Sequence, residues 1–185
     1  MIEAVVLEAA LLLAQARSPG ALQARETAYA RVALAERIAG DPDLLKAIVA
    51  KNHVVESPTD IRRIDEAWIH NPRYPLRKTL TSGPCADRLR KLVADDKLVV
   101  EAFLMDERGG LVCGTVETSD YWQGDEAKWR KTYRDGAQVF VDEPALDAST
   151  GVFAVQLSRL VSDARGGKVG ALTLTLKIPR SRLSR

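Results

Sequence analysis

Two stretches decide the fold: residues 98–116, LVVEAFLMDERGGLVCGTV, and residues 152–178, VFAVQLSRLVSDARGGKVGALTLTLKI. Each holds two runs of strand-forming residues joined by nearly the same turn, DERGG at 106–110 and DARGG at 163–167. An aspartate that opens a turn accepts hydrogen bonds from its own backbone, and glycine supplies the positive φ that short hairpins need. Both stretches are therefore predicted to be antiparallel hairpins.

The last strand of the second hairpin has the clearest period of two. Its alternating sets are Leu172, Leu174, Leu176 and Ile178 on one face, and Ala171, Thr173, Thr175 and Lys177 on the other. This pattern predicts a strand with one buried apolar face and one milder face. A further short strand is predicted at 139–141, followed by a turn at 142–144 and a connecting loop at 146–151.

The N-terminal half is predicted to be helical. Residues 2–16 and the amphipathic stretch 21–39 each favour a helix, the second ending at Gly40. Asp41-Pro42 and Ser57-Pro58 are helix start signals, with a capping side chain followed by a proline at the first helical position. Residues 72–84 are expected to form a loop with one helical turn at 76–81, and residues 85–95 a short helix.

Aromatic residues gather between the two hairpins, although they make up only 5% of the chain. Tyr121, Trp122, Trp129 and Tyr133 lie in one short segment, and residues 125–134 of it are predicted to form a helix over the sheet. Such rings serve equally well to cover the apolar face of a sheet and to cap a pocket. The sequence leaves both interpretations open.

The order of several short segments resembles the Cache family, the PAS-like sensor domains of bacterial signalling receptors. These segments are the first turn, TSDYWQGDE at 118–126, Lys128-Trp129, VFVDEP at 139–144, DASTG at 147–151 and KVGAL at 168–172. The resemblance implies an α+β fold, with a PAS-like antiparallel sheet of about five strands, a long N-terminal helix and a helical N-terminal half. It divides the chain into helices at 1–96, a sheet at 97–180 and a basic tail at 181–185, together one structural domain.

The resemblance also implies that residues 118–135 form the lid of a ligand pocket. The ligand-binding residues expected from it are Tyr121, Trp122, Trp129, Tyr133, Asp147 and Thr115. Amino-acid-binding Cache domains carry an Arg or Lys before the lid tryptophan, a Tyr-x-Asp after the next proline and an Asp in the last strand. The corresponding positions here are Glu126, Ala145 with Asp147, and Thr175, so that only Asp147 matches.

The mismatch at Glu126 affects the charge of the ligand. A carboxylate ligand would be repelled by Glu126 unless Lys128, Arg130 or Lys131 turns inward. The ligand is therefore expected to be a small molecule of undetermined identity.

Composition and motifs give little support to other functions. The 27 Lys and Arg nearly balance the 25 Asp and Glu, which gives no case for nucleic acid binding. No nucleophile motif, phosphate loop or metal-ligand spacing is present, so we expect no catalysis, metal or cofactor. His53 and His70 are expected to be structural or surface residues. An unrecognised enzyme would have to use carboxylates such as Asp120, Asp125 and Asp147.

The cysteines and the N-terminus bear on location. Cys85 and Cys113 are expected to be free structural thiols, with a disulfide as the alternative in an oxidising compartment. The apolar residues 4–13 and the small residues 14–16 hint at a secretory signal, but residues 1–3 carry no positive charge and Glu8 interrupts the apolar run, so a helix is favoured. No stretch is long and apolar enough to span a membrane. The resemblance implies an extracytoplasmic or secreted domain, with membrane anchors outside this chain; a cytoplasmic location stays open.

A second hypothesis is a ligand-free PAS-like module that serves structure or dimerisation. It predicts a filled interior behind Trp129. It also predicts a homodimer through the helix at 21–39, whose apolar stripe includes Val32 and Leu34.

Overall fold

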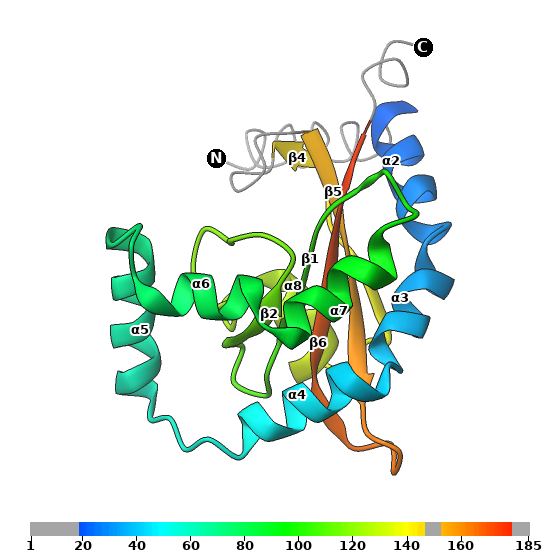
Figure 1. Cartoon of the computed structure of the whole chain (residues 1–185). Coiled ribbons are helices and arrows are strands. Elements are labelled where there is room, and N and C mark those ends of the chain that lie inside the picture. Colours follow the sequence, from blue (N-terminus) through cyan, green and yellow to red (C-terminus); the bar gives the residue numbers. More distant parts are fainter. Residues whose placement is uncertain (1–18, 147–152, 179–185) are drawn as a thin grey trace, which may run out of the picture.

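The structure is a computed structural model that describes residues 19–146 and 153–178 (Figure 1). The helix expected at 2–16, the tail at 181–185 and Asp147 lie outside this part. The helical half consists of α2 (Pro19–Tyr29), α3 (Val32–Ala39), α4 (Pro42–Asn52), α5 (Pro58–His70), α6 (Pro75–Ser82) and α7 (Pro84–Val93). The second half consists of β1 (Val99–Met105), β2 (Leu111–Gly114), α8 (Ala127–Trp129), the π-helix η1 (Arg130–Arg134), β3 (Val139–Val141), β4 (Ala145–Leu146), β5 (Phe153–Ser162) and β6 (Lys168–Lys177).

The helix start signals act as their residue types predict. The Asp41 carboxylate accepts bonds from the backbone N–H groups of Asp43 and Leu44 at the start of α4, and Ser57 forms a capping box with Asp60 at the start of α5. Helix α6 extends over the whole of Pro75–Ser82, so it is longer than the single turn expected at 76–81. A proline in its first turn, where the missing N–H costs nothing, explains the start of this helix.

The helix predicted at 21–39 is divided into α2 and α3 by a turn at Ala30 and Arg31. The Arg31 side chain donates a hydrogen bond to the Thr27 carbonyl near the end of α2, and its Nε lies 2.8 Å from the Asp96 carboxylate. The division therefore coincides with a long-range ion pair. No glycine or proline marks it in the sequence.

The predicted hairpins are confirmed, and both belong to one antiparallel sheet. Its main strand order is β2-β1-β6-β5-β3, and the short β4 also pairs with β5. The pairs β1–β2 and β5–β6 are the two hairpins, and β1 and β6 lie side by side in the centre. The fold class, an α+β domain with a helical N-terminal half, is as predicted.

Both turns have the predicted geometry. In the first turn (residues 106–110), one carboxylate oxygen of Asp106 accepts the N–H groups of Arg108 and Gly110, at 2.8 and 2.9 Å. In the second turn (residues 163–167), Asp163 does the same. Gly109 and Gly166 supply the positive φ, at 83° and 80°.

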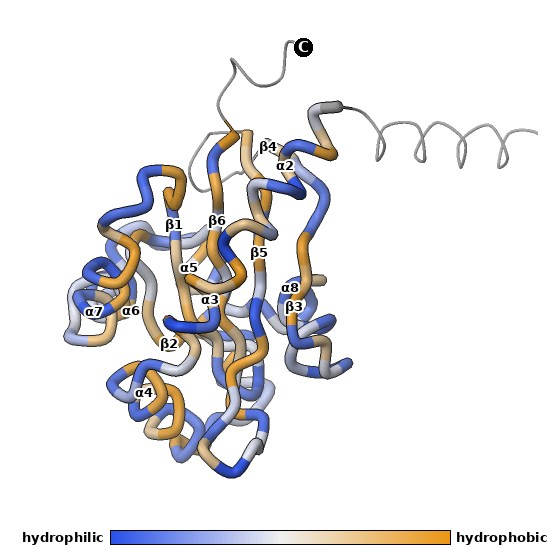
Figure 2. Tube along the Cα trace, turned by 90° about the vertical axis from the view of Figure 1, so that its right-hand side faces the viewer, coloured by the Kyte–Doolittle hydropathy of each residue, from blue (hydrophilic) through white to orange (hydrophobic). Residues whose placement is uncertain are grey.

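Each face of the sheet has its own apolar core. On one face, the alternate residues Leu172, Leu174 and Leu176 pack beneath α2, α3, α4 and α7. On the opposite face, Phe103, Met105 and Ala171 pack with residues of α5 and with Tyr121. Figure 2 shows β1, β6 and β5 side by side in sheet order, with α4 and α7 towards the β1 side of the sheet and α8 towards the β3 side. The sheet is therefore a middle layer with helices on both faces.

The face of β6 that carries Thr173 and Thr175 is not exposed to solvent, as it would be in a sheet with only one covered face. Thr173 and Thr175 are fully buried. The segments α8 and η1, within residues 118–135, pack against β5 and β6. Alternation alone cannot distinguish a polar face turned to water from a polar face closed by another segment.

The expectation of free thiols is wrong. Cys85 of α7 and Cys113 of β2 form a disulfide, with their Cα atoms 6.0 Å apart. The two residues are 28 positions apart in the sequence and meet because α7 packs against β1 and β2. In the part of the chain that the structure describes, no helix has the length and apolar character required to cross a membrane.

Candidate ligand-binding site

Residues 118–135, called the lid below, are fastened to the first turn. The Trp122 indole N–H donates to the Arg108 carbonyl at 2.8 Å, and the Trp129 indole N–H donates to the Asp106 carbonyl at 3.0 Å. Two aromatic residues predicted to contact a ligand thus use their only polar hydrogen to hold the lid in place. The second turn has the same sequence pattern but no such cover.

The lid backbone also meets the turn directly. The Gln123 N–H donates to the Gly109 carbonyl at 2.8 Å, and Gly110 and Trp122 form an isolated bridge. A Cβ on Gly109 would lie 2.4 Å from the Gly124 Cα, closer than packed atoms can approach. Both glycines are therefore needed for the lid to seat on the turn.

The predicted helix at 125–134 consists of a single α-turn, α8, followed by the π-helix η1. Trp129 and Tyr133 stack with ring centroids 5.1 Å apart. π-helical turns often occur at functional sites, where the extra residue re-aims side chains. Here the α-turn places Lys128, and the π-turn Thr132, on the inner side of the lid, where both are buried.

Lys128 is the inward cation that a carboxylate ligand would require. It is 8% exposed, whereas Arg130 and Lys131 face solvent. Its ammonium lies 5.4 Å from the centre of the Phe103 ring on the lid-covered face of the sheet, and 3.7 Å from the Glu126 carboxylate. An ammonium buried between the lid and the sheet is costly unless anions or aromatic faces compensate it.

Beneath the lid, the sheet carries a buried polar layer. Thr175 of β6 donates to the Glu101 carboxylate of β1 at 2.6 Å, and Ser158 of β5 bonds with Thr173 of β6 at 2.9 Å. In each pair the two residues lie directly opposite each other on neighbouring strands, on the sheet face that carries Phe103. All four residues are almost completely buried.

Acidic groups at the start of the lid complete the local charge. Burial raises the pKa of Asp120, Glu126 raises it further, and Lys128 opposes the shift. The Gln123 side chain donates to Asp120, while its own amide oxygen is buried without a hydrogen-bond partner. The lid interior therefore holds one buried ammonium with carboxylates and an unpaired amide acceptor close by.

Tyr121 is set deeper than the other three rings and is fixed from α5. Its backbone N–H and that of Trp122 both donate to the Asp65 carboxylate at 2.9 Å. Its hydroxyl donates to Glu56 at 3.3 Å, and its ring packs against Trp68. Burial, with the charge of Glu56 second, raises the pKa of Tyr121.

The structure brings the four predicted rings into one lid but separates the other two site residues from them. Thr115 follows β2, where its hydroxyl and N–H pair with the Ala102 backbone of β1. Asp147 lies outside the described residues. In residues 19–146 and 153–178, no group of three or more His, Cys, Asp or Glu side chains could hold a metal ion.

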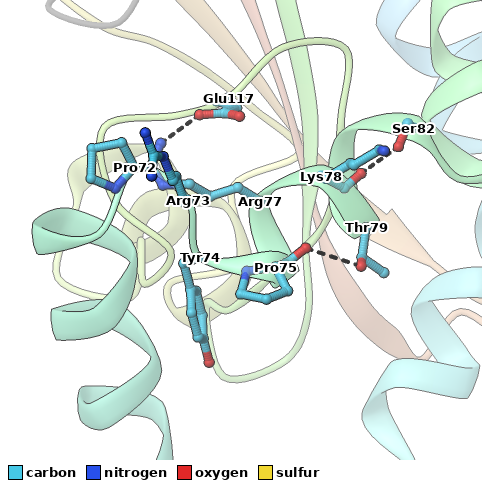
Figure 3. A pocket seen from close by; sticks show the side chains of 9 residues that line it. All are labelled: Pro72, Arg73, Tyr74, Pro75, Arg77, Lys78, Thr79, Ser82 and Glu117. Atoms are coloured by element: carbon cyan, nitrogen blue, oxygen red, sulfur yellow. Dashed lines mark hydrogen bonds and ion pairs between the residues drawn. The ribbon is translucent and has the colours of Figure 1, made fainter.

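Two hollows flank Tyr74, the residue directly before α6. One, of about 520 Å³, is bounded by α5, α6 and Tyr121. The other, of about 560 Å³, is lined by Arg73, Arg77 and Glu117 (Figure 3). In Figure 3 the Tyr74 ring points away from the ion pair between Arg77 and Glu117. Tyr74, Pro75 and Thr79 line both hollows.

Sequence reasoning missed Glu101, Ser158, Glu56 and Asp65. A single acidic residue in the strand VVEAFLM is the only sequence signal for Glu101. Lys128 was one of three candidates for an inward cation, and only helical phase in the folded lid distinguishes it from Arg130 and Lys131.

The arrangement is an α+β domain: one antiparallel sheet with the lid over one face and helices on the other. No protein-family model matches the sequence, and no curated protein matches it either. Solved structures match it in fold. The sensor domain of the V. cholerae histidine kinase DctB matches with a TM-score of 0.52 at 14% identity, covering 99% of this chain and 60% of that one.

Two chemoreceptor domains also match. That of Pseudomonas fluorescens CtaA, in complex with L-isoleucine, gives a TM-score of 0.44 at 16% identity, over 85% of this chain and 52% of that one. That of Pseudomonas aeruginosa PctC, in complex with GABA, gives 0.43 at 18% identity, over 66% and 58%. The chain thus spans between about half and 60% of the length of these structures. The Cache-type fold that the resemblance implied is confirmed, as a fold shared with the DctB sensor domain.

Proposed function

We propose that this chain is a small-molecule-sensing domain of a bacterial signalling receptor, and that it binds its ligand without turnover. We further propose that the ligand carries a carboxylate and binds between the lid and the sheet. The observation that carries the proposal is the buried ammonium of Lys128 on the inner side of the lid.

The energetic argument concerns what Lys128 contacts. A Lys buried to this extent retains its charge only when anions or dipoles replace the lost water. Glu126, at 3.7 Å, is too distant for a strong hydrogen bond, and its side chain is 43% exposed. A ligand carboxylate at Lys128 would complete the compensation. The sheet layer, with the Glu101–Thr175 and Ser158–Thr173 pairs, would orient the polar remainder of the ligand.

Signalling would follow from the way the lid is held. Its attachment to the first turn and to Asp65 of α5 links any ligand-dependent lid movement to the helical half. The response is limited by the difference in ligand affinity between the two lid positions. The Cys85–Cys113 disulfide supports an extracytoplasmic location, since such bonds persist in oxidising compartments.

Thermal shift with matched probes tests this function. Succinate and 4-methylpentanoate, each compared with its neutral amide analogue, provide carboxylates that differ in size and charge and carry no ammonium group. Ligand at 100 times its Kd stabilises by about 2.7 kcal/mol, a shift that is readily measured. The panel is extended to other small carboxylates, each with its amide. We expect at least one carboxylate to stabilise the wild type and the control variant Lys131→Met, which loses an exposed lysine of the same segment, and to have no effect on Lys128→Met. Stabilisation that survives in Lys128→Met would refute the role of Lys128.

One observation favours a second candidate, a ligand-free dimerisation module: the indole N–H groups of Trp122 and Trp129 are already used within the chain. Val32 and Leu34, the residues predicted from the sequence to lie in the dimer interface, pack against the chain's own core. A dimer interface would therefore have to use other residues of this helical segment. Leu22 and Tyr29 of α2 are the exposed apolar residues, at 50% and 60%. Sedimentation of Leu22→Glu against wild type tests this: a dimer that dissociates, with no ligand found, favours the module.

A further inference from the structure

We propose a second small-molecule site, separate from the lid interior, in the groove bounded by α5, α6 and Tyr121, and that it takes a small organic ammonium with an apolar or aromatic body. The groove has a volume of about 520 Å³. This volume lies in the range of small-molecule pockets, which combine apolar walls with a few convergent polar groups.

The walls of the groove are apolar and come from three parts of the chain. The side chains that form them are Ile64 of α5, Tyr74 before α6, Leu76 and Leu80 of α6, Leu111 of β2 and Tyr121 of the lid. Four of them also pack against the second apolar core as only partly buried residues: Ile64, Tyr74, Leu76 and Leu80. These four side chains are therefore supported from behind while their near sides stay open to a ligand, and Leu111 and Tyr121 are buried at the base of the groove.

One end of the groove is built around a cation. The Lys51 ammonium lies 2.5 Å from the Glu56 carboxylate and 5.7 Å from the centre of the Tyr121 ring. The other Glu56 oxygen accepts the Tyr121 hydroxyl at 3.3 Å. A carboxylate beside an aromatic face is the environment that recognises organic ammonium groups. Lys51 reaches it on a flexible side chain from the end of α4, so a ligand ammonium can take its place.

A second carboxylate lies behind this end. Asp106 is completely buried, and its Oδ2 atom has no hydrogen-bond partner. A Cβ on Gly110 would lie 2.9 Å from the Tyr121 hydroxyl and 3.4 Å from this Oδ2 atom, so the missing side chain leaves the two groups facing the same space. The nearby Arg108 cation is paired with Glu107.

The local charge sets the sign of the ligand. Two carboxylates, Glu56 and Asp106, face a single ammonium, that of Lys51. Burial raises the pKa of Tyr121, the charges of Glu56 and Asp106 raise it further, and the charge of Arg108 opposes them. An ammonium ligand is therefore favoured over a carboxylate ligand.

The probes are 2-phenylethylamine and 3-phenylpropionate, which present a similar phenyl body with opposite charge. Isothermal calorimetry on the whole chain is expected to show binding of the amine and none of the acid. Glu56→Gln should weaken amine binding about tenfold, as loss of a charge-assisted hydrogen bond implies. Lys51→Met should tighten it, because the internal competitor is removed. Weaker binding in Lys51→Met, equal binding of the acid, or no amine binding to the wild type would overturn the proposal.

A matched pair of bulky substitutions locates the site. Thr79 lines both this groove and the hollow of Figure 3, whereas the adjacent Lys78 lines only that hollow, so Lys78→Trp controls for ligand binding there. Both are exposed on α6, so either is expected to accept a tryptophan without loss of the fold. Thr79→Trp should abolish amine binding and Lys78→Trp should retain it; equal affinity of the two variants would contradict the assignment.

The two proposed sites can fail separately. Lys128→Met should abolish the carboxylate response of the lid and leave amine binding unchanged. If amine binding is lost in Lys128→Met and unaffected by Thr79→Trp, the amine occupies the lid interior and the second site does not exist.

Discussion

The repeated turn allows a mutational experiment with an internal control. Gly109 and Gly166 occupy equivalent positions in the two turns, with φ of 83° and 80°. An alanine in this left-handed conformation costs about 1–2 kcal/mol. No heavy atom lies within 4 Å of a Cβ added at Gly166, so Gly166→Ala should show this backbone cost and nothing more.

Gly109→Ala adds the cost of displacing the lid. Its Cβ would lie 2.4 Å from the Cα and 2.6 Å from the nitrogen of Gly124, and both are backbone atoms that move only with the lid. Overpacking of this kind costs about 1–3 kcal/mol. The movement would also weaken the hydrogen bonds from Gln123 N–H and from the Trp122 indole to the turn, each worth about 1 kcal/mol. We expect Gly109→Ala to cost about 2–4 kcal/mol more than Gly166→Ala.

Urea unfolding followed by circular dichroism measures both values. Tryptophan fluorescence gives a second readout, because Trp122 and Trp129 are packed against the first turn and would report a displaced lid in the folded protein. The spectrum of Gly166→Ala should match that of the wild type. Two variants of equal stability and unchanged fluorescence would refute the conclusion that the lid is fastened to this turn.

Three further predictions concern stability. Reducing the disulfide, or replacing Cys85 and Cys113 with alanine, should cost about 3.5 kcal/mol, as expected from chain entropy for residues 28 apart; an unchanged urea midpoint in dithiothreitol would contradict the bond. Burial raises the pKa of Asp106, so the free energy of unfolding of the wild type should fall as the pH rises from the pKa of the unfolded state to that of the folded state. The Asp106→Asn variant has no such titration, so its stability relative to the wild type should increase from pH 3 to 7. A difference between the two proteins that does not change with pH would contradict this prediction. The hydrogen bond from Arg88 lowers the pKa of Asp41, so the ionised carboxylate stabilises the folded protein above the pKa of the unfolded state, and this stabilisation is lost as the pH falls below it. Asp41→Ala should therefore lower the free energy of unfolding in urea by at least about 1 kcal/mol at pH 7 and by less at pH 2. An equal cost at both pH values would argue against the ion pair.

The sheet was predictable because its signals are local. The Asp-x-x-Gly-Gly turns carry their own hydrogen-bond acceptor and their own positive-φ residue, so each hairpin is specified by its turn and its flanking strands. The helix starts at Asp41-Pro42 and Ser57-Pro58 are specified in the same way. The turn that divides residues 21–39 is different, since Arg31 pairs with Asp96, a residue 65 positions away.

The chemistry of the site was less predictable, because it depends on which side chains the closed lid turns inward. The sequence indicates that aromatic residues cluster at 121–133, but the indole donors of Trp122 and Trp129 bind the first turn, which no local pattern encodes. The cysteines show the same limitation. Their pairing depends on α7 packing across β2, and two cysteines of unlike local setting give no hint of it.

The lid also explains why one turn is buried and its copy is not. In the second turn, the Asp163 carboxylate has the same two backbone partners as Asp106, but it lies in the partly exposed tip of a hairpin. In the first turn, Trp122 and Trp129 bind the outward carbonyls and enclose Asp106, whose Oδ2 atom then lies buried behind Tyr121. The seated lid therefore buries both the Asp106 carboxylate of the proposed groove and Lys128. Ligands at the two sites should consequently influence each other's affinity, and the Gly109→Ala variant, by displacing the lid, should weaken both.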